Sequence, residues 1–385
     1  MAGTSAIDDA VIDRVREAAA TLSPLSSQIE EGRRLPAVAV EALVSSGLFK
    51  LLVPRIYGGG EASLSTVLAA IEEVARADGS AGWCAMIGVT SGLMSVFLPD
   101  DVAREVYGAD DAVTCGVFAP MGRATRAAGG YRVTGRWPFA SGCEHSRWRM
   151  GGAIVTGDPP DLLPSGAPNV RSMLFAADDT LVIDTWHTSG LRGTGSHDLE
   201  VRDVFVPEAR SFSLITDRPR IDTPAYRIPF FGVLAAGVAS VALGIARSAV
   251  DAASALVKQK QAPGAKRTVA HRELVQMQIA EAEARVRASR AFLFAEVAAI
   301  LASPGELLEA RALLRLAAWH ATKESALAVD LAYAVGGASA IYTKNPLQRH
   351  FRDVHVATQH VMVAPVSATL AGRILLDVES DTSTL

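Results

Sequence analysis

Three long helical runs near the C-terminus constrain the fold of this chain more than any other feature. Residues 232–259, 272–301 and 306–337 each extend over about thirty residues, rich in alanine and apolar with helical spacing. At 1.5 Å per residue, each run would be a rod of about 40 Å. Because such rods bury their small apolar faces against one another, the sequence predicts a helical bundle from about residue 227 onward.

A β-rich stretch precedes the bundle. Between about residues 112 and 225 the chain contains short β-branched or aromatic runs, such as AVTCGVFA and DLEVRDVFVP, separated by Gly, Pro, Asp and Asn. Runs of this kind predict a β-domain of roughly seven or eight strands. The TGDPPDLLPSGAPN stretch between two of them is expected to be a surface loop.

The first hundred residues or so are helical again. Residues 39–54 carry apolar residues on one face, and their helix is expected to end at Pro54. The next helix is expected to begin at a Ser63 cap and to end near Asp78. Residues 81–97 are small and apolar on all sides, which predicts a helix that is buried all round.

The order of these regions indicates the fold class. Helical, β and helical regions that follow one another without alternating βαβ units predict an α+β fold that is mainly α. We expect an N-terminal helical domain at residues 1–111, a middle β-domain at residues 112–226 and a C-terminal bundle at residues 227–385.

Charge and composition narrow the classes of function. With a net charge of -4 the chain has no basic field, so nucleic acid is not an expected partner. No apolar run reaches about eighteen residues and the N-terminus mixes acids and bases, so we expect a cytoplasmic protein without a membrane segment. The three cysteines lack C-x-x-C spacing, so no metal site is expected. A mean hydropathy of +0.23 favours an oligomer.

Several common catalytic and nucleotide-binding motifs are absent. The sequence has no G-x-G-x-x-G that opens a helix after a strand, no Walker motif and no G-x-S-x-G elbow. It therefore shows no NAD(P)H fingerprint of its own. The glycine-rich residues 57–63 follow a helix and are interpreted as a loop.

The helical tail carries polar residues that packing alone does not explain. Residues 336–360, GGASAIYTKNPLQRHFRDVHVATQH, hold two glycines, three histidines and three arginines or lysines. Together with five earlier segments, this tail resembles the acyl-CoA dehydrogenase fold and, more closely, the group D flavin-dependent monooxygenases, which are two-component hydroxylases. The segments are LLVPRIYGGGEAS, SAGWCAMIG, GVFAPMGRA, WPFASGCEHSRW, GLRGTGSHDLEVRDVFVP and NPLQRHFRDVHVATQH.

This resemblance covers nearly the full chain and implies both an architecture and a flavin site. The architecture is a helical N-terminal domain, a middle β-barrel or sandwich and a C-terminal four-helix bundle, assembled as a homotetramer. In WPFASG, the Ser141 hydroxyl and a backbone amide would bond the N5/O4 edge of the isoalloxazine; a strand that ends in a polar turn is the alternative. GVFAP would line the pyrimidine edge, unless it is an ordinary central strand. The cofactor-binding residues implied here are Phe118, Trp137, Phe139 and Ser141.

Contacts to the cofactor phosphate are implied farther along the chain. Gly336 and Gly337 match a pair that lets the backbone approach the phosphate or adenylate, commonly on a neighbouring subunit; a helix C-cap is the alternative. Arg267 falls where the family supplies an arginine to the phosphate, and an exposed loop arginine is the alternative. Arg352 either faces the same pocket or forms a structural ion-pair network with Asp353.

The two branches of this fold need different chemistry. A dehydrogenase needs a carboxylate to remove the α-proton of a thioester. The two family positions for it fall near Val361 and Leu234, and both are apolar. An oxygenase needs reduced flavin, O2 and a water-poor pocket with a donor beside the flavin–oxygen adduct. The resemblance therefore favours the oxygenase branch.

The expected catalytic residues are His360, Ser141 and, as second choice, His355. His360 occupies the position of a histidine that group D enzymes carry near the adduct, and an imidazole with a pKa of about 6.5 exchanges protons at neutral pH. A structural histidine is the alternative for either ring.

The expected substrate-binding residues lie in the helix after SAGW. Related hydroxylases carry a further histidine there that meets a phenol, whereas Thr90 or Ser91 stands in its place here. Trp83 would shape the pocket. A simple phenol is therefore a doubtful substrate.

The resemblance also implies partners. Reduced flavin, FMN or FAD, would arrive by diffusion from a separate NAD(P)H-flavin reductase, and the other reactants would be O2 and an aromatic or polyketide-like small molecule. Two alternatives remain open: an FAD-dependent dehydrogenase with an unrecognised base, and a flavin-free scaffold with the same fold.

Overall fold

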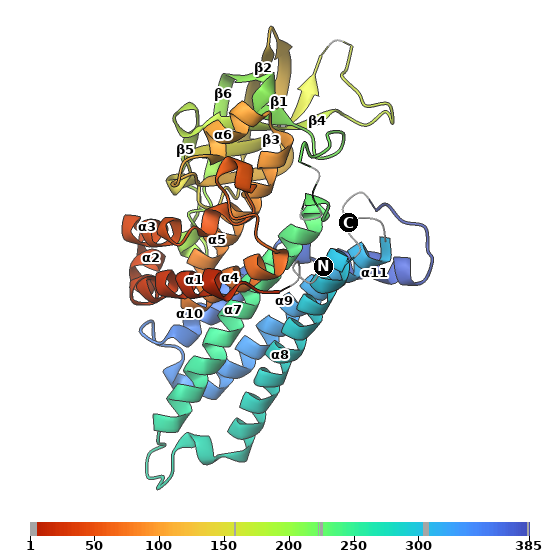
Figure 1. Cartoon of the computed structure of the whole chain (residues 1–385). Helices are drawn as coiled ribbons and strands as arrows, with labels where there is room; N and C mark the ends of the chain where they lie inside the picture. The colour runs from red at the N-terminus through yellow and green to blue at the C-terminus, as the bar shows by residue number, and fades with distance from the viewer. Residues whose placement is uncertain (1–5, 158, 222, 224–225, 303–307, 383–384) are drawn as a thin grey trace.

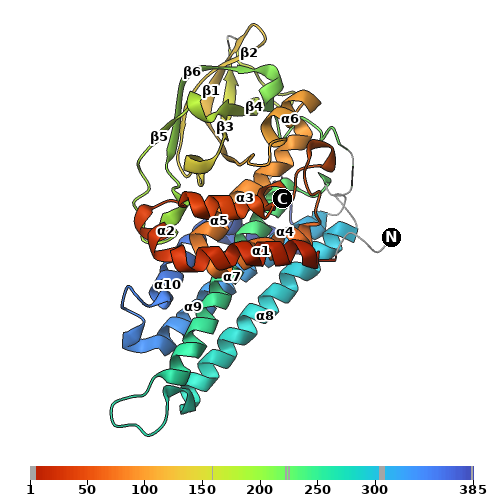
Figure 2. The same cartoon turned by 60° about the vertical axis from the view of Figure 1, so that its left-hand side comes forward.

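The computed structural model describes residues 6–157, 159–221, 223, 226–302, 308–382 and 385. The N-terminal helices lie between a β-sheet at one end of the molecule and a bundle of long helices at the other (Figure 1). The same arrangement is visible after a turn of 60° (Figure 2). The predicted order of helical, β and helical regions is confirmed.

The N-terminal region of the described chain contains six α-helices. They are α1 (Asp9–Leu22), α2 (Ser26–Gly32), α3 (Ala37–Ser45), α4 (Leu64–Ala77), α5 (Gly79–Ser91) and α6 (Asp100–Tyr107). The predicted cap of α4 is confirmed, since the Ser63 side chain accepts a hydrogen bond from the Thr66 amide. The expectation that a helix runs to Pro54 is wrong: α3 ends at Ser45, because Gly47 adopts a left-handed φ of 75° and turns the chain away.

In the part of the chain that the structure describes, seven strands form one sheet in the order β5-β6-β2-β1-β3-β4-β7. The β1–β3 pair is parallel, and the other pairs are antiparallel. The register of β1 against β3 shifts between Val117 and Gly122. The strands are β1 (Thr114–Ala127), β2 (Gly130–Trp137), β3 (Trp148–Thr156), β4 (Val170–Ala176), β5 (Leu181–Ile183), β6 (Asp198–Pro207) and β7 (Ser211–Phe212).

The indole of Trp137 fills the interior of the sheet. Its Nε1 donates a 2.8 Å hydrogen bond to the Gly152 carbonyl, and its side chain is buried. Gly122, Gly135 and Gly151 make room for it, since a Cβ at any of them would lie between 2.4 and 2.6 Å from the indole. The side chain of Trp137 therefore packs the interior of the β-domain, and its expected contact with the flavin stays a prediction.

The predicted thirty-residue runs are confirmed as three long helices. Together with α10, which packs on α7 and α9, they make the bundle. The C-terminal helices are α7 (Phe230–Gln259), α8 (Glu273–Ala302), α9 (Leu308–Gly336), α10 (Pro346–Ala357) and α11 (Pro365–Leu375).

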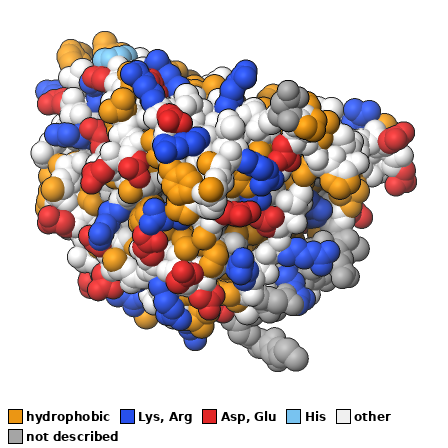
Figure 3. Space-filling model, turned by 90° about the horizontal axis from the view of Figure 1, so that it is seen from above, with side chains coloured by type: hydrophobic (Ala, Val, Ile, Leu, Met, Phe, Trp, Pro, Cys, Tyr) orange, Lys and Arg blue, Asp and Glu red, His pale blue; other side chains and the backbone are white. Residues whose placement is uncertain are grey.

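Two helical segments, Gly79–Phe97 and Phe230–Gln259, are long and apolar enough to cross a membrane. Their apolar windows are 89% and 83% buried inside the fold, so packing within the protein accounts for their composition. Side chains of both signs are interspersed with apolar ones on the face seen from above, without a field of one sign (Figure 3).

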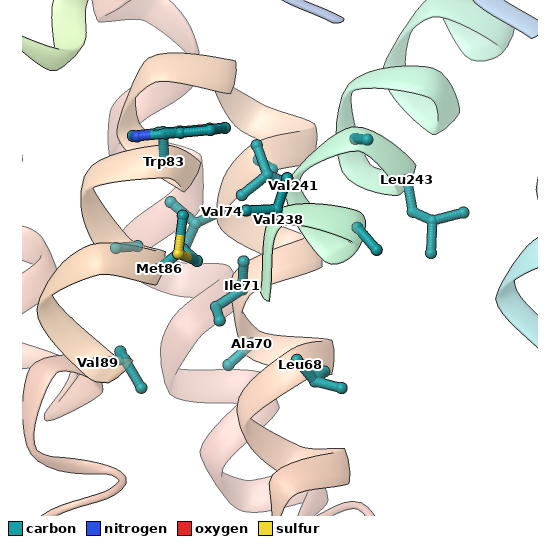
Figure 4. Close-up of a cluster of buried hydrophobic side chains, with 14 of the residues drawn as sticks. Leu68, Ala70, Ile71, Val74, Trp83, Met86, Val89, Val238, Val241 and Leu243 are labelled. Atoms are coloured by element: carbon teal, nitrogen blue, oxygen red, sulfur yellow. The ribbon is translucent and has the colours of Figure 1, made fainter. Parts of the chain in front are cut away.

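Small residues let α5 and α7 cross α4 at one point. Ala75 on α4 faces Gly82 of α5 and Gly244 of α7, where an added Cβ would lie 2.4 Å and 2.7 Å from the Ala75 Cβ. Around this crossing, Ile71 and Val74 of α4 lie beside Met86 of α5 in a cluster of buried side chains that α7 also joins (Figure 4). These contacts set how closely α5 packs against α4.

We predict that Gly82→Ala lowers the free energy of unfolding by roughly 1–3 kcal/mol, because the new methyl group meets the α4 backbone. Gly372→Ala is a matched control in α11, where a Cβ meets no atom within 4 Å. It should stabilise the protein by about 0.5–1 kcal/mol through helix propensity. Urea denaturation measures both values, and equal effects of the two substitutions would contradict the close crossing.

Candidate functional site

A loop of the middle domain is tied to α10. Gly190 lies so close to this helix that a Cβ there would meet the Arg352 carbonyl oxygen at 2.3 Å. The next residue, Leu191, donates a 2.6 Å hydrogen bond from its amide to Oδ1 of Asp353 and has a left-handed φ of 47°. Because this φ is strained for a branched side chain, the surrounding contacts have to hold it.

Asp353 is buried where α5, α10 and this loop meet. A Cβ on Gly79, at the start of α5, would lie 3.1 Å from its Oδ2. Burial, and secondly the charge of Asp78, raise the pKa of Asp353 from 3.8 to about 7. The carboxyl group is therefore partly protonated at neutral pH.

A chain of buried hydroxyl groups runs from α5 into the same loop. Nε1 of Trp83 donates to Oγ of Ser141 at 3.0 Å. Ser141 and Ser196 share a 2.6 Å hydrogen bond, and Ser196 shares another of 2.6 Å with Thr194. The Thr194 hydroxyl donates to the Leu191 carbonyl at 2.9 Å. This chain of hydroxyl groups therefore ends at Leu191, whose amide is hydrogen-bonded to Asp353.

The ring of His360 packs edge-on against the Trp83 indole, with centroids 5.5 Å apart. Its Nδ1 accepts a 3.3 Å hydrogen bond from the Met362 amide, which places the proton of the neutral ring on Nε2. Burial, and secondly the charge of Arg315, lower the pKa of His360 to about 4. At neutral pH this ring is thus a fixed donor, which differs from the proton exchange expected of a pKa of about 6.5.

Arg315, a buried residue of α9, holds the turn that follows His360. Its guanidinium donates to the Met362 carbonyl at 3.2 Å and to the Ser367 hydroxyl at 3.0 Å. The same turn presents the His360 Nδ1 acceptor to its own backbone, so Arg315 helps to set the orientation of the ring.

Phe139 is strained and exposed. It has a left-handed φ of 66°, its side chain is 68% exposed, and it contacts the Trp186 ring edge-on. A large aromatic residue in this region of φ is typical of a functional site. Two residues earlier, Trp137 points into the sheet, so the turn at Pro138 reverses the direction of the side chains.

Thr90 and Ser91 are buried and have their hydroxyl protons committed to the helix. They donate to the carbonyls of Met86 and Ile87, both at 2.8 Å. Neither therefore has a free proton to donate to a substrate, and their expected contact with one stays a prediction.

His355 and Arg352 are engaged by neighbouring side chains. His355 Nε2 lies 2.9 Å from Asp330 of α9. Arg352 pairs with Glu30 at 2.6 Å and bonds Gln348, whereas Asp353 accepts from Leu191. The ion-pair alternative for Arg352 thus has a different partner from the expected Asp353.

The expected phosphate residues lie at the other end of the bundle. Lys260 Nζ donates to the Gly336 carbonyl at 2.9 Å, and Gly337 has a left-handed φ of 53° at the end of α9. Phe118, by contrast, is half-buried beside Phe230 at the start of α7. Arg267 is exposed in the segment between α7 and α8. That segment lies at the bottom of the picture, away from α5 (Figure 1).

Four residues that organise the site were not predicted from the sequence: Thr194, Ser196, Arg315 and Asp353. The role missed for Asp353 is that it anchors Leu191. A charged residue in the alanine-rich ALLRLAAWH run was a usable signal for Arg315, because a charge on a buried helix face needs a partner. Thr194 and Ser196 lie inside GLRGTGSH, and nothing in the sequence of that segment indicates their hydrogen-bond partners.

Comparisons with known proteins agree with the observed fold. Two family models match the chain, acyl-CoA dehydrogenase N-terminal domain at residues 6–98 and acyl-CoA dehydrogenase C-terminal domain at residues 236–365. Indole-3-acetate monooxygenase from Pseudomonas putida is 32% identical, over 94% of this chain and 92% of that protein. The chain belongs to the acyl-CoA dehydrogenase superfamily, in its flavin-dependent monooxygenase branch.

Two further proteins support that membership. The oxygenase component of the FADH2-dependent resorcinol hydroxylase from Rhizobium sp. strain MTP-10005 is 31% identical, over 96% of this chain and 94% of that protein. The structure of XiaF from Streptomyces sp. in complex with FADH2 and glycerol has a TM-score of 0.88 to this one at 28% identity. That match covers 96% of this chain and 95% of the other.

The cluster around Trp83 fits the flavin that this branch uses. Ser141 has one hydrogen-bonding position beyond its bonds to Trp83 and Ser196, and His360 offers an Nε2 proton. Phe139 adds an exposed aromatic face at the same turn. An isoalloxazine presents both donors and acceptors along a flat ring. Within the described residues, no hydrogen bond joins Trp83, Ser141 or His360 to a carboxylate.

We predict that Asp353→Asn changes how stability depends on pH. The native carboxyl group binds its proton up to a pKa of about 7, whereas the unfolded group releases it near 3.8. The wild type therefore loses stability as pH rises from 3.8 to 7. The Asn variant lacks this loss.

Urea denaturation at several pH values measures the effect. The stability of the Asn variant relative to the wild type should increase by more than about 1 kcal/mol between the two pKa values and then stay constant. Parallel curves would show that the Asp353 carboxyl group titrates like an exposed one.

Proposed function

We propose that this chain is the oxygenase component of a two-component monooxygenase that hydroxylates an aromatic small molecule. The observation that carries the proposal is the neutral His360 donor packed on Trp83, next to a buried Ser141 hydroxyl. Two relatives are named for activity on indole-3-acetate and on resorcinol, which supports a substrate with an aromatic ring.

The reaction balances with reduced flavin as the electron source. Reduced flavin supplies two electrons, one atom of O2 enters the substrate as a hydroxyl group, and the other leaves as water. The role of this protein would be to exclude water from the reactants and to orient them by fixed hydrogen bonds. His360 suits that part because its proton stays on Nε2 across the neutral pH range.

The residues at the two dehydrogenase positions do not support proton abstraction from a thioester. Val361 is 63% exposed and Leu234 is buried in α7, and neither side chain can accept a proton. The dehydrogenase alternative therefore has no base at either position.

The proposal includes the partners expected from the sequence. Reduced FMN or FAD would come from a separate NAD(P)H-flavin reductase in the cytoplasm. A homotetramer is supported by the large apolar side chains Leu274, Met277, Ile341 and Tyr342, each more than half exposed. It is also supported by the separation of Arg267, Gly336 and Gly337 from the Ser141 cluster, since a second copy could bring these residues to that cluster.

We predict that the purified chain, supplied with chemically reduced FMN or FAD under anaerobic conditions and then mixed with O2, hydroxylates an aromatic probe. Indole-3-acetate and resorcinol are suitable first probes. Incorporation of labelled oxygen from O2 into the product, measured by mass spectrometry, checks the reaction. A protein that binds neither redox state of flavin would instead be a scaffold. One that stays yellow and reduces with an acyl-CoA would be a dehydrogenase.

We predict that His360→Ala leaves folding and flavin affinity largely intact and raises release of hydrogen peroxide. Loss of one positioned donor should change the ratio of peroxide to oxidised flavin several-fold, since one hydrogen bond contributes about 1 kcal/mol. His355→Ala is the matched control on α10 and should leave this ratio unchanged. Equal ratios for the wild type and His360→Ala would remove His360 from the reaction.

A further inference from the structure

The hydrogen bond from the Thr194 hydroxyl to a carbonyl favours one direction for the protons of the hydroxyl chain. A carbonyl oxygen only accepts, so the Thr194 hydroxyl spends its single proton on Leu191. Thr194 must then accept from Ser196, whose single proton is spent in turn. Ser196 must therefore accept from Ser141.

The other end of the chain has the same direction. The indole Nε1 of Trp83 can only donate, and it donates to Ser141. Ser141 thus receives one proton and gives its own away to Ser196. Its one remaining hydrogen-bonding position is an acceptor lone pair. Reversal of the chain would leave two oxygens, those of Thr194 and Leu191, 2.9 Å apart without a proton between them.

We infer that Ser196 and Thr194 are specificity-determining residues that make the site select reduced over oxidised flavin. The inference rests on the proposed function, in which the flavin ring lies at the Trp83–Ser141–His360 cluster. The central ring of reduced flavin carries an N–H at N5, whereas the same nitrogen of oxidised flavin carries a lone pair. The resemblance implies that the N5 edge of the flavin would face Ser141, and an acceptor-only Ser141 would bond the first form and repel the second.

This selection suits an enzyme whose cofactor arrives by diffusion. The site would retain the reduced form and release the oxidised form after turnover, so the chain would need no covalent or permanent hold on the flavin. Neither Ser196 nor Thr194 has to touch the ring, because both act through the orientation of the Ser141 proton.

The test compares dissociation constants of oxidised and anaerobically reduced FMN or FAD for the wild type, Ser196→Ala and Thr194→Val. In Ser196→Ala the Ser141 proton loses its acceptor and becomes free to bond oxidised flavin. The ratio of oxidised to reduced dissociation constants should fall about three- to tenfold, mainly through tighter binding of the oxidised form, as one hydrogen bond predicts. The midpoint potential of the bound flavin should become more negative accordingly.

Two further variants keep the test decisive. Thr194→Val retains the shape of the side chain and should shift the ratio in the same direction but less, because the Ser196 proton can then point either way. Ser146→Ala removes a buried hydroxyl from the segment between β2 and β3, which also carries Ser141. This hydroxyl bonds the Gly142 carbonyl and is not part of the hydroxyl chain, so the variant should leave the ratio unchanged. Equal changes in both constants, or an unchanged ratio in both chain variants, would overturn the inference while the proposed function stands. A wild type that binds neither form would overturn both.

Discussion

The hydrogen bond from the Leu191 amide to Asp353 joins the three regions of the chain at one buried point. The carboxyl group belongs to α10, the amide to a loop of the middle domain, and Gly79 at the start of α5 packs against the carboxyl group. Burying a carboxyl group in this way is costly, which is why its pKa rises to about 7. The buried carboxyl group fixes the position of Leu191, and the Leu191 carbonyl can then accept the hydrogen bond of the Thr194 hydroxyl from a fixed direction. Without that anchor, a strained loop would have to hold the polar site alone.

Close helix packing fixes the position of Trp83, the aromatic residue of the site. Trp83 follows Gly82 directly, and Gly82 is the residue that lets α5 lie against Ala75 of α4. A larger residue there would move the helix outward and carry the indole away from Ser141, to which it is bonded at 3.0 Å. The position of the ring is therefore set in part by the contacts that the preceding residue makes on another face of α5.

The fold was largely predictable and the site only in part, for physical reasons. The thirty-residue runs become α7, α8 and α9 because helix periodicity depends on neighbours three and four residues away, which the sequence shows directly. Ser141 and His360 were expected near the flavin and Trp83 in the substrate pocket; the three lie together, while their roles stay predictions. The hydroxyl chain could not be read in advance, since it joins residues 58 and 55 positions apart by bonds that only the tertiary fold creates. The burial of Trp137 inside the sheet could not be read in advance either, because a strand alternates its faces and spacing alone does not say which face is the core.

The charged groups of the site stand one layer behind its surface. Arg315 acts on His360 through the Met362 turn, and Asp353 acts on Thr194 through Leu191. The groups in front of them are a neutral imidazole, a hydroxyl and an indole, which hydrogen-bond a ring without attracting the ordered water that exposed charges hold. Each charge therefore fixes the direction of a neutral donor or acceptor, and direction is the property by which such a site distinguishes a ring nitrogen that carries a proton from one that does not. Under the proposed function, a site built this way would gain its selectivity for reduced flavin from the orientation of its protons.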